Sequence, residues 1–185
     1  MNIRNTLLSL LTLTTTVTAP ALAGYEVDGY HFMDGSEFGQ NSSVARQMIN
    51  TLEDHGVAVL DGEANGVKAC DPQEDGSRVL GFYSPQYNFM VVCSSSDIPT
   101  WLQFETLVHE TVHVIQDLRD GIDNDSLIGP QGEYMSYLGK NLHPAKVENI
   151  QAMYDRKDWA IEAEAFFFET RPQACLLYTS DAADD

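Results

Sequence analysis

Residues 109–113 read His-Glu-Thr-Val-His, a spacing that suits metal-assisted hydrolysis. On an α-helix, residues four apart lie one turn apart on the same face, so His109 and His113 can reach one ion through neutral ring nitrogens. Zn²⁺ is the ion that this pattern favours, and Glu110 beside the two histidines is placed to act as general base toward water. The alternative is a pair of surface histidines on a solvated helix face.

A catalytic zinc site usually takes three protein ligands, so the pattern needs one more. Residues 158–166 are predicted to be helical and contain Glu162 and Glu164. The small side chains of Ala163 and Ala165 permit close packing against the histidine helix, which favours Glu162 as the third ligand. Glu164 points about 200° away from Glu162 on an ideal helix, so only one of them can bind the ion. The alternative is that both carboxylates are solvated; other ligand candidates are Asp117, Asp120 and His143.

Hydrolysis of an amide also needs a donor toward the developing oxyanion. His143, Tyr137 and Tyr154 are candidates by residue type alone. Gln116 and Asp117 follow His113 by about one turn and can orient the ligands, although ordinary helix-surface residues explain them equally well.

The elements that must hold these residues follow from hydrophobic spacing. Residues 100–119 form the most regular predicted helix, with Gly121 as its stop and both histidines opposite the apolar stripe. Further helices are predicted at 133–139, 145–154 and 158–170, with Pro144 in a first helical position and Asp158 as an N-cap. The stripe consists of Trp101, Phe104, Leu107, Val108, Thr111, Val112, Ile115 and Leu118.

The part of the chain before residue 100 is predicted to supply a small sheet. Residues 25–32 can form a strand, which Gly29 weakens, and a helix follows Asn41, with Gly56 just past its end. Residues 57–60 read as a strand, and 78–83 and 87–93 as a hairpin. A helix and small sheet followed by helices alone predict an α+β fold.

Both ends of the chain are expected to lie outside this domain. Residues 1–23 resemble a secretory signal peptide that ends in Ala-Leu-Ala, which places the mature start at Gly24 and the protein outside the cytosol, secreted or periplasmic. A membrane anchor is the weaker alternative, because the apolar part is short and rich in threonine. Residues 175–185 look like the in-frame translation of a sequencing-library adapter, which leaves 24–174 as the predicted domain.

Cysteine number and charge narrow the function classes. Without the suspect tail, Cys70 and Cys93 remain, and an even pair in an exported protein predicts a disulfide. Two free thiols are the alternative. The formal net charge of −18 disfavours nucleic acid and anionic membranes as partners, so no membrane association is expected once the leader is removed.

His-Glu-Thr-Val-His followed by a helix with Glu162-Ala-Glu164-Ala165 resembles the gluzincin branch of zinc metallopeptidases and is similar to ImmA/IrrE-type peptidases. This resemblance covers about residues 78–170 and implies a zincin-like fold. In it, a Gly-x-Tyr strand (81–83) and an edge strand (87–93) precede the histidine helix. A metzincin would need Gly and His where Gln116 and Arg119 stand, so that pattern fails.

The resemblance implies a zinc-dependent peptidase with Glu110 as general base, His109, His113 and Glu162 as ligands, and a peptide or protein as substrate. An extended substrate is expected to pair with the edge strand 87–93. Two other hypotheses are a zincin-like module that binds a protein or peptide without cleaving it, and a structural protein whose histidines bind nothing.

Overall fold

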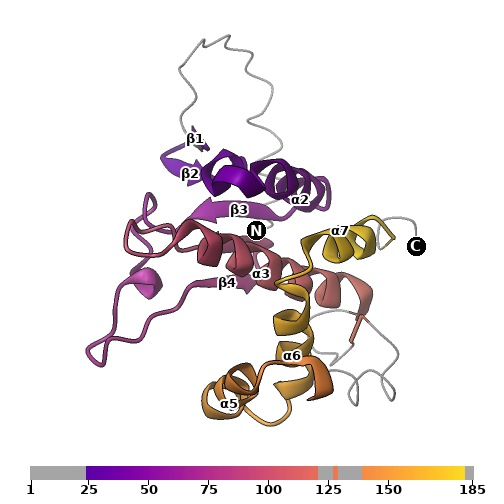
Figure 1. The fold of residues 1–185 in the computed structure, drawn as a ribbon. Helices are drawn as coiled ribbons and strands as arrows, with labels where there is room; N and C mark the ends of the chain where they lie inside the picture. The colour runs from indigo at the N-terminus through magenta and orange to yellow at the C-terminus, as the bar shows by residue number, and fades with distance from the viewer. Residues whose placement is uncertain (1–23, 121–126, 129–138, 182–185) are drawn as a thin grey trace. The chain divides into compact units, whose positions relative to one another are not determined.

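Five strands form one mixed sheet in the part of the chain that precedes the histidine helix (Figure 1). The computed structural model describes residues 24–120, 127–128 and 139–181. It divides into two compact units, Met1–Gln103 and Phe104–Asp185. The order of the strands across the sheet is β1-β2-β3-β5-β4, with β3 and β5 parallel and the other neighbouring pairs antiparallel.

The predicted strand at 25–32 is instead a hairpin of β1 (Tyr25–Val27) and β2 (Tyr30–Phe32). Asp28 and Gly29 both have positive φ angles, 52° and 82°. Two consecutive residues of that kind form the tight turn whose twist matches antiparallel strands, and Asp-Gly is one of its preferred sequences. The prediction of a single strand was therefore wrong, because the Asp-Gly signal marks a reversal of the chain.

Helix α2 (Ser42–Asp54) packs its apolar face into the core of this unit and leads into β3 (Ala58–Asp61). The predicted helix after Asn41 and the strand that follows it are confirmed. Gly56 stands just past the end of α2 with a φ of 78°, as a helix-stopping glycine does. The short 3₁₀-helix η1 (Ser36–Asn41) precedes α2, whose buried residues are Ala45, Met48, Ile49 and Leu52.

The predicted hairpin at 78–93 is present as β4 (Gly81–Ser84) and β5 (Phe89–Val92). The expectation that residues 87–93 form an edge strand was wrong. β5 lies between β3 and β4 and pairs with both, so its backbone hydrogen-bonding groups are already used. Among the described strands, β4 is the edge next to β5, so a strand added at this end of the sheet would pair with β4.

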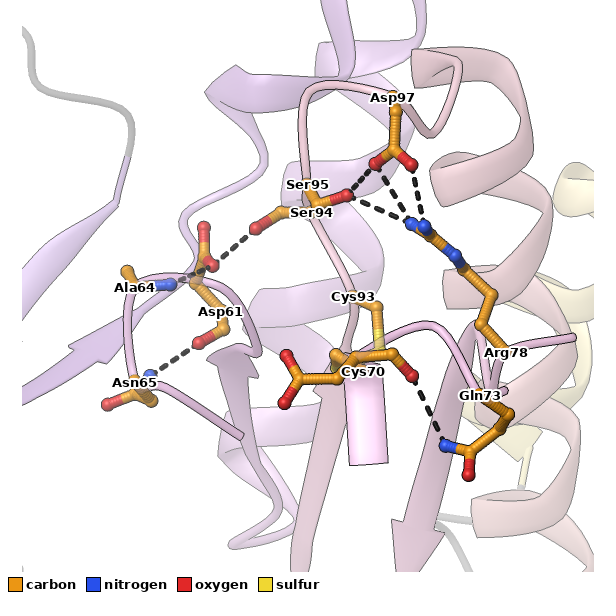
Figure 2. Close-up of a disulfide and its surroundings, with 11 residues drawn as sticks. Asp61, Ala64, Asn65, Cys70, Gln73, Arg78, Cys93, Ser94, Ser95 and Asp97 are labelled. Atoms are coloured by element: carbon orange, nitrogen blue, oxygen red, sulfur yellow. Dashed lines mark hydrogen bonds and ion pairs between the residues drawn. A yellow bond between two sulfur atoms is a disulfide. The ribbon is translucent and has the colours of Figure 1, made fainter. Parts of the chain in front are cut away.

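The disulfide between Cys70 and Cys93 is formed, as predicted (Figure 2). It joins η2 (Lys68–Cys70) to the residue that follows β5. The sulfur of Cys70 lies against the backbone of Gly62, where an added β-carbon would be only 2.5 Å from Cys70 Sγ. Gly62 therefore provides the space in which the bridge packs.

An ion pair links two segments of the chain close to the disulfide. Arg78 binds Asp97 through two nitrogen–oxygen contacts of 2.9 and 2.6 Å, and Arg78 also donates to Ser95 (Figure 2). Ser94 donates to Asp61 at the end of β3. The bridge and the Arg78 contacts thus join the chain before β4 to the residues that follow β5, and the Ser94 contact joins those residues to the end of β3.

Replacing Cys70 and Cys93 by serine should lower the free energy of unfolding by about 3 kcal/mol, since the bridge closes a loop with a sequence separation of 23. Urea unfolding with and without a reductant measures this effect, and reductant should not destabilise the double variant further. Under denaturing, non-reducing conditions, thiol titration should find one group per chain, because Cys175 is the free cysteine. Three titratable thiols would contradict the bridge.

Helices make up the secondary structure described after the sheet: α3 (Thr100–Asp120), α5 (Pro144–Met153), α6 (Trp159–Phe168) and α7 (Pro172–Asp181). The α+β layout is thus confirmed, and Pro144 occupies the first helical position as expected. Asp158 stands at the N-cap of α6, but its side chain makes no capping hydrogen bond. The predicted helix at 133–139 lies, except for Gly139, outside the described residues.

No described helix is both long and apolar enough to cross a membrane.

Candidate metal centre

The middle of α3 is buried on the face that carries the histidines as well as on its apolar face. His109 is 8% exposed and Glu110 is 7% exposed, whereas Trp101 and Leu118, at the ends of the predicted stripe, are exposed. The apolar positions at the centre of the stripe are buried as predicted. The alternative of a solvated histidine face is therefore wrong, because side chains of α6 cover that face.

Three side chains from two helices converge at this point. His109 and His113 come from successive turns of α3, and Glu162 comes from the first turn of α6. The Nε2 atoms of the two histidines are 3.2 Å apart. Glu162 Oε2 lies 3.3 Å from His109 Nε2, and Glu162 Oε1 lies 3.6 Å from His113 Nε2. One ligand atom from each residue lies within 4.8 Å of the other two, a group that could hold a metal ion.

The choice between Glu162 and Glu164 is decided by the contacts of α6. Glu164 is fully buried, and its Oε2 accepts hydrogen bonds from Gln116 Nε2 at 2.8 Å and from the backbone N–H of Ile128 at 2.9 Å. Glu162 faces the two histidines instead. The two carboxylates thus point to different neighbours, as the helical geometry required, and Glu162 is the one placed with the histidines.

Gln116 fixes how His113 presents its ring. Its Oε1 lies 2.8 Å from His113 Nδ1, and its Nε2 donates to Glu164. Because that Nε2 must donate, Oε1 is the acceptor, and His113 Nδ1 carries the proton. The lone pair of His113 is then on Nε2, the atom directed at Glu162. Of the two expectations for Gln116, the orienting role fits this geometry.

Glu169 and Lys146 complete the surroundings of His109 and were not expected from the sequence. Glu169 Oε2 lies 3.5 Å from His109 Nδ1, and the Glu169 carboxylate forms an ion pair with Lys146 of α5. The ring of Phe166 meets His109 edge-on, with centroids 4.7 Å apart. A sequence signal for Glu169 existed: it follows Glu162 by seven residues, two helical turns, and so falls on the same side of the helix.

Glu169→Ala should weaken zinc binding by about 10- to 100-fold, the usual effect of removing a carboxylate that orients a ligand histidine. Glu169→Gln should recover part of this loss, because its amide oxygen can still accept from His109 Nδ1. Competition with a chromogenic zinc chelator measures the affinity. Glu148→Gln, an exposed glutamate on α5, is the matched control and should bind as wild type. Wild-type affinity in Glu169→Ala would show that the contact does not position His109.

The three proposed oxyanion donors have different positions. Tyr154 forms a side-chain hydrogen bond with Glu162, and burial together with the charges of Glu162 and Glu110 raises the pKa of its phenol above the ordinary range. His143 is exposed and caps α5, with its Nδ1 accepting from the backbone N–H of Ala145 at 3.3 Å. Tyr137 lies outside the described residues. Of the two described donors, Tyr154 is the one with a contact to the three-residue group.

The donor set fits a divalent cation. His113 carries its proton on Nδ1, and a carboxylate lies 3.5 Å from His109 Nδ1, so the two Nε2 atoms and the carboxylate of Glu162 are free to face one cation. Glu162 Oε2 is buried and has no hydrogen-bond partner among the described residues. Two imidazoles and one carboxylate are a usual ligand set for zinc. The three side chains present could therefore hold a divalent metal ion without any change of partners.

No protein-family model matches this chain, and no curated protein or solved structure matches it either.

Proposed function

We propose that this protein is an exported zinc metallopeptidase that hydrolyses peptide bonds. The observation that carries the proposal is the convergence of His109, His113 and Glu162, with Glu110 next to the first histidine and buried beside it. The family resemblance of residues 109–113 supports a gluzincin type of site, and the Cys70–Cys93 disulfide is consistent with an extracellular location.

The three ligand residues would hold the ion, which supplies a Lewis acid that polarises a carbonyl group and makes water more acidic. Glu110 takes a proton from the attacking water and returns it to the leaving amine. The charge of Glu110 contributes to the raised pKa of Tyr154. The Tyr154 phenol is protonated at neutral pH and has one hydrogen, which Glu162 accepts here. Turning that O–H from Glu162 to the carbonyl oxygen lets it donate to the oxyanion that forms there.

The surroundings of the three ligand residues favour a catalytic metal site over a structural one. Gln116, Glu169 and Tyr154 contact ligand residues directly and hold their orientation, which is the preorganisation that catalysis requires. A simple structural ion would need four protein ligands and no base beside it. Three converging ligands with a neighbouring glutamate favour a site that leaves one position for a reactant.

The test is metal analysis of protein purified without a histidine tag, followed by incubation with a peptide library. One equivalent of zinc and cleavage that stops with a chelator and returns with zinc are expected. Near-zero zinc after reconstitution would rule out both the peptidase and a zinc-binding module. Zinc uptake with peptide binding but no cleavage would favour the binding module over the enzyme.

A further inference from the structure

Gly24, the expected first residue of the mature chain, lies where the first unit leaves no space for a side chain. Its φ is +80°, and a β-carbon added to it would lie 2.1 Å from the carbonyl oxygen of Phe32. The next residue, Tyr25, begins β1, stacks on Phe32 and donates to Glu53 Oε1 at 2.6 Å. Only glycine therefore fits here, and the strand that follows holds its backbone in place.

Two carboxylates meet at this glycine. Asp34 accepts hydrogen bonds from the backbone N–H groups of Gly24 and Ser36, the second at 2.8 Å. Glu37 Oε1 would lie 3.1 Å from a β-carbon on Gly24, and it accepts from the backbone N–H of Asp34 at 3.2 Å. Glu37 Oε2 is buried and has no hydrogen-bond partner among the described residues. Buried acceptors are normally satisfied, so this oxygen needs a donor.

Neither carboxylate has a positive charge in hydrogen-bond contact within the described part of the chain. The charge of Arg46 acts on Asp34 at longer range. Burial raises the pKa of the Glu37 carboxyl, and the Asp34 charge adds to that rise, because both effects disfavour a second negative charge here. A cation supplied at Gly24 would relieve both effects.

We propose that the α-amino group of Gly24, released by cleavage after residue 23, binds as an ammonium between the carboxylates of Asp34 and Glu37. An amide nitrogen has one hydrogen to donate, which Asp34 already accepts. An α-ammonium has three, so the contact to Asp34 is kept and further donors become available to Glu37. Each contact then joins two opposite charges, and such hydrogen bonds are stronger than neutral ones.

This arrangement makes removal of the leader a step that stabilises the fold. While residue 23 is attached, the nitrogen of Gly24 is an uncharged amide, and Glu37 has no ionic partner among the described residues. One extra residue moves the ammonium by the length of one peptide unit, about 3.8 Å, which is enough to break a hydrogen bond. The fully processed chain is therefore expected to be more stable than a chain that is one residue longer.

The test compares the chain that starts at Gly24 with the chain that starts at Ala23, each released from a fusion by a protease that leaves no extra residue. The Gly24 form should melt about 2–4 °C higher, the shift that one charge-assisted contact gives in a chain of this size. In the Glu37→Gln background most of this difference should disappear. Equal melting temperatures, or an undiminished difference in Glu37→Gln, would overturn the proposal.

A second measurement does not depend on that variant. An aldehyde reagent selective for α-amines should label the Gly24 form at least about tenfold more slowly than the Ala23 form, because a paired ammonium is a poor nucleophile. Equal labelling rates would overturn the proposal, and so would an exported protein whose first residue, by N-terminal sequencing, is not Gly24. None of these readouts depends on metal binding or peptidase activity.

Discussion

The Glu110→Gln protein is expected to bind zinc as wild type does and to cleave peptides about 10²- to 10⁴-fold more slowly. Glutamine has nearly the same shape as glutamate, so the buried side chain keeps its packing, and the three ligand residues are unchanged. What is lost is the carboxylate that accepts the proton of water. The effect should therefore fall on kcat, with a smaller change in KM.

Initial rates on a cleaved library peptide, with zinc content determined on the same samples, measure this separation. Glu105→Gln is the matched control, because it makes the same change about 1.4 turns earlier on α3, and it should retain activity. Activity that survives in Glu110→Gln would show that another group is the base. Loss of zinc in Glu110→Gln would show instead that this glutamate contributes to holding the ion.

The second prediction compares the same substitution at two positions of α6 that lie two residues apart. Only the first of the two should have a large effect on zinc affinity. Glu162→Gln should lower zinc affinity by more than about 100-fold, since it removes a ligand charge and even indirect contacts are worth 10- to 100-fold. Glu164→Gln should keep zinc within a few-fold. Its amide oxygen can still accept from Gln116 and from the backbone of Ile128, the contacts that Glu164 makes now.

Thermal unfolding with and without zinc provides the stability readout for this pair. Zinc at about 100 times its Kd stabilises a protein by about 2.7 kcal/mol, and Glu162→Gln should lose that gain. Without zinc, Glu162→Gln should be at least as stable as wild type, because it removes a buried charge whose Oε2 has no described hydrogen-bond partner. Equal zinc stabilisation of wild type and Glu162→Gln would exclude Glu162 as a ligand.

Local signals in the sequence predicted much of the fold. Helical spacing predicted α2 and α3, and the apolar runs at 57–60 and 78–93 predicted three strands, because these patterns depend on neighbours within a few residues. The hairpin at 25–32 was missed although its Asp-Gly turn signal is local. The place of β5 inside the sheet could not be predicted, since pairing with β3 joins segments separated by a long stretch of chain.

The sequence by itself determined that His109 and His113 share one face of a helix, because the rise and turn of an α-helix place residues four apart one above the other. It also determined that Glu162 and Glu164 face different directions, and it predicted that Cys70 and Cys93 would pair. Only the tertiary structure decided that Glu162 meets the histidines while Glu164 binds Gln116, a contact across 48 residues. Local spacing orients a side chain on its own helix, but the packing of separate helices decides which side chains it meets.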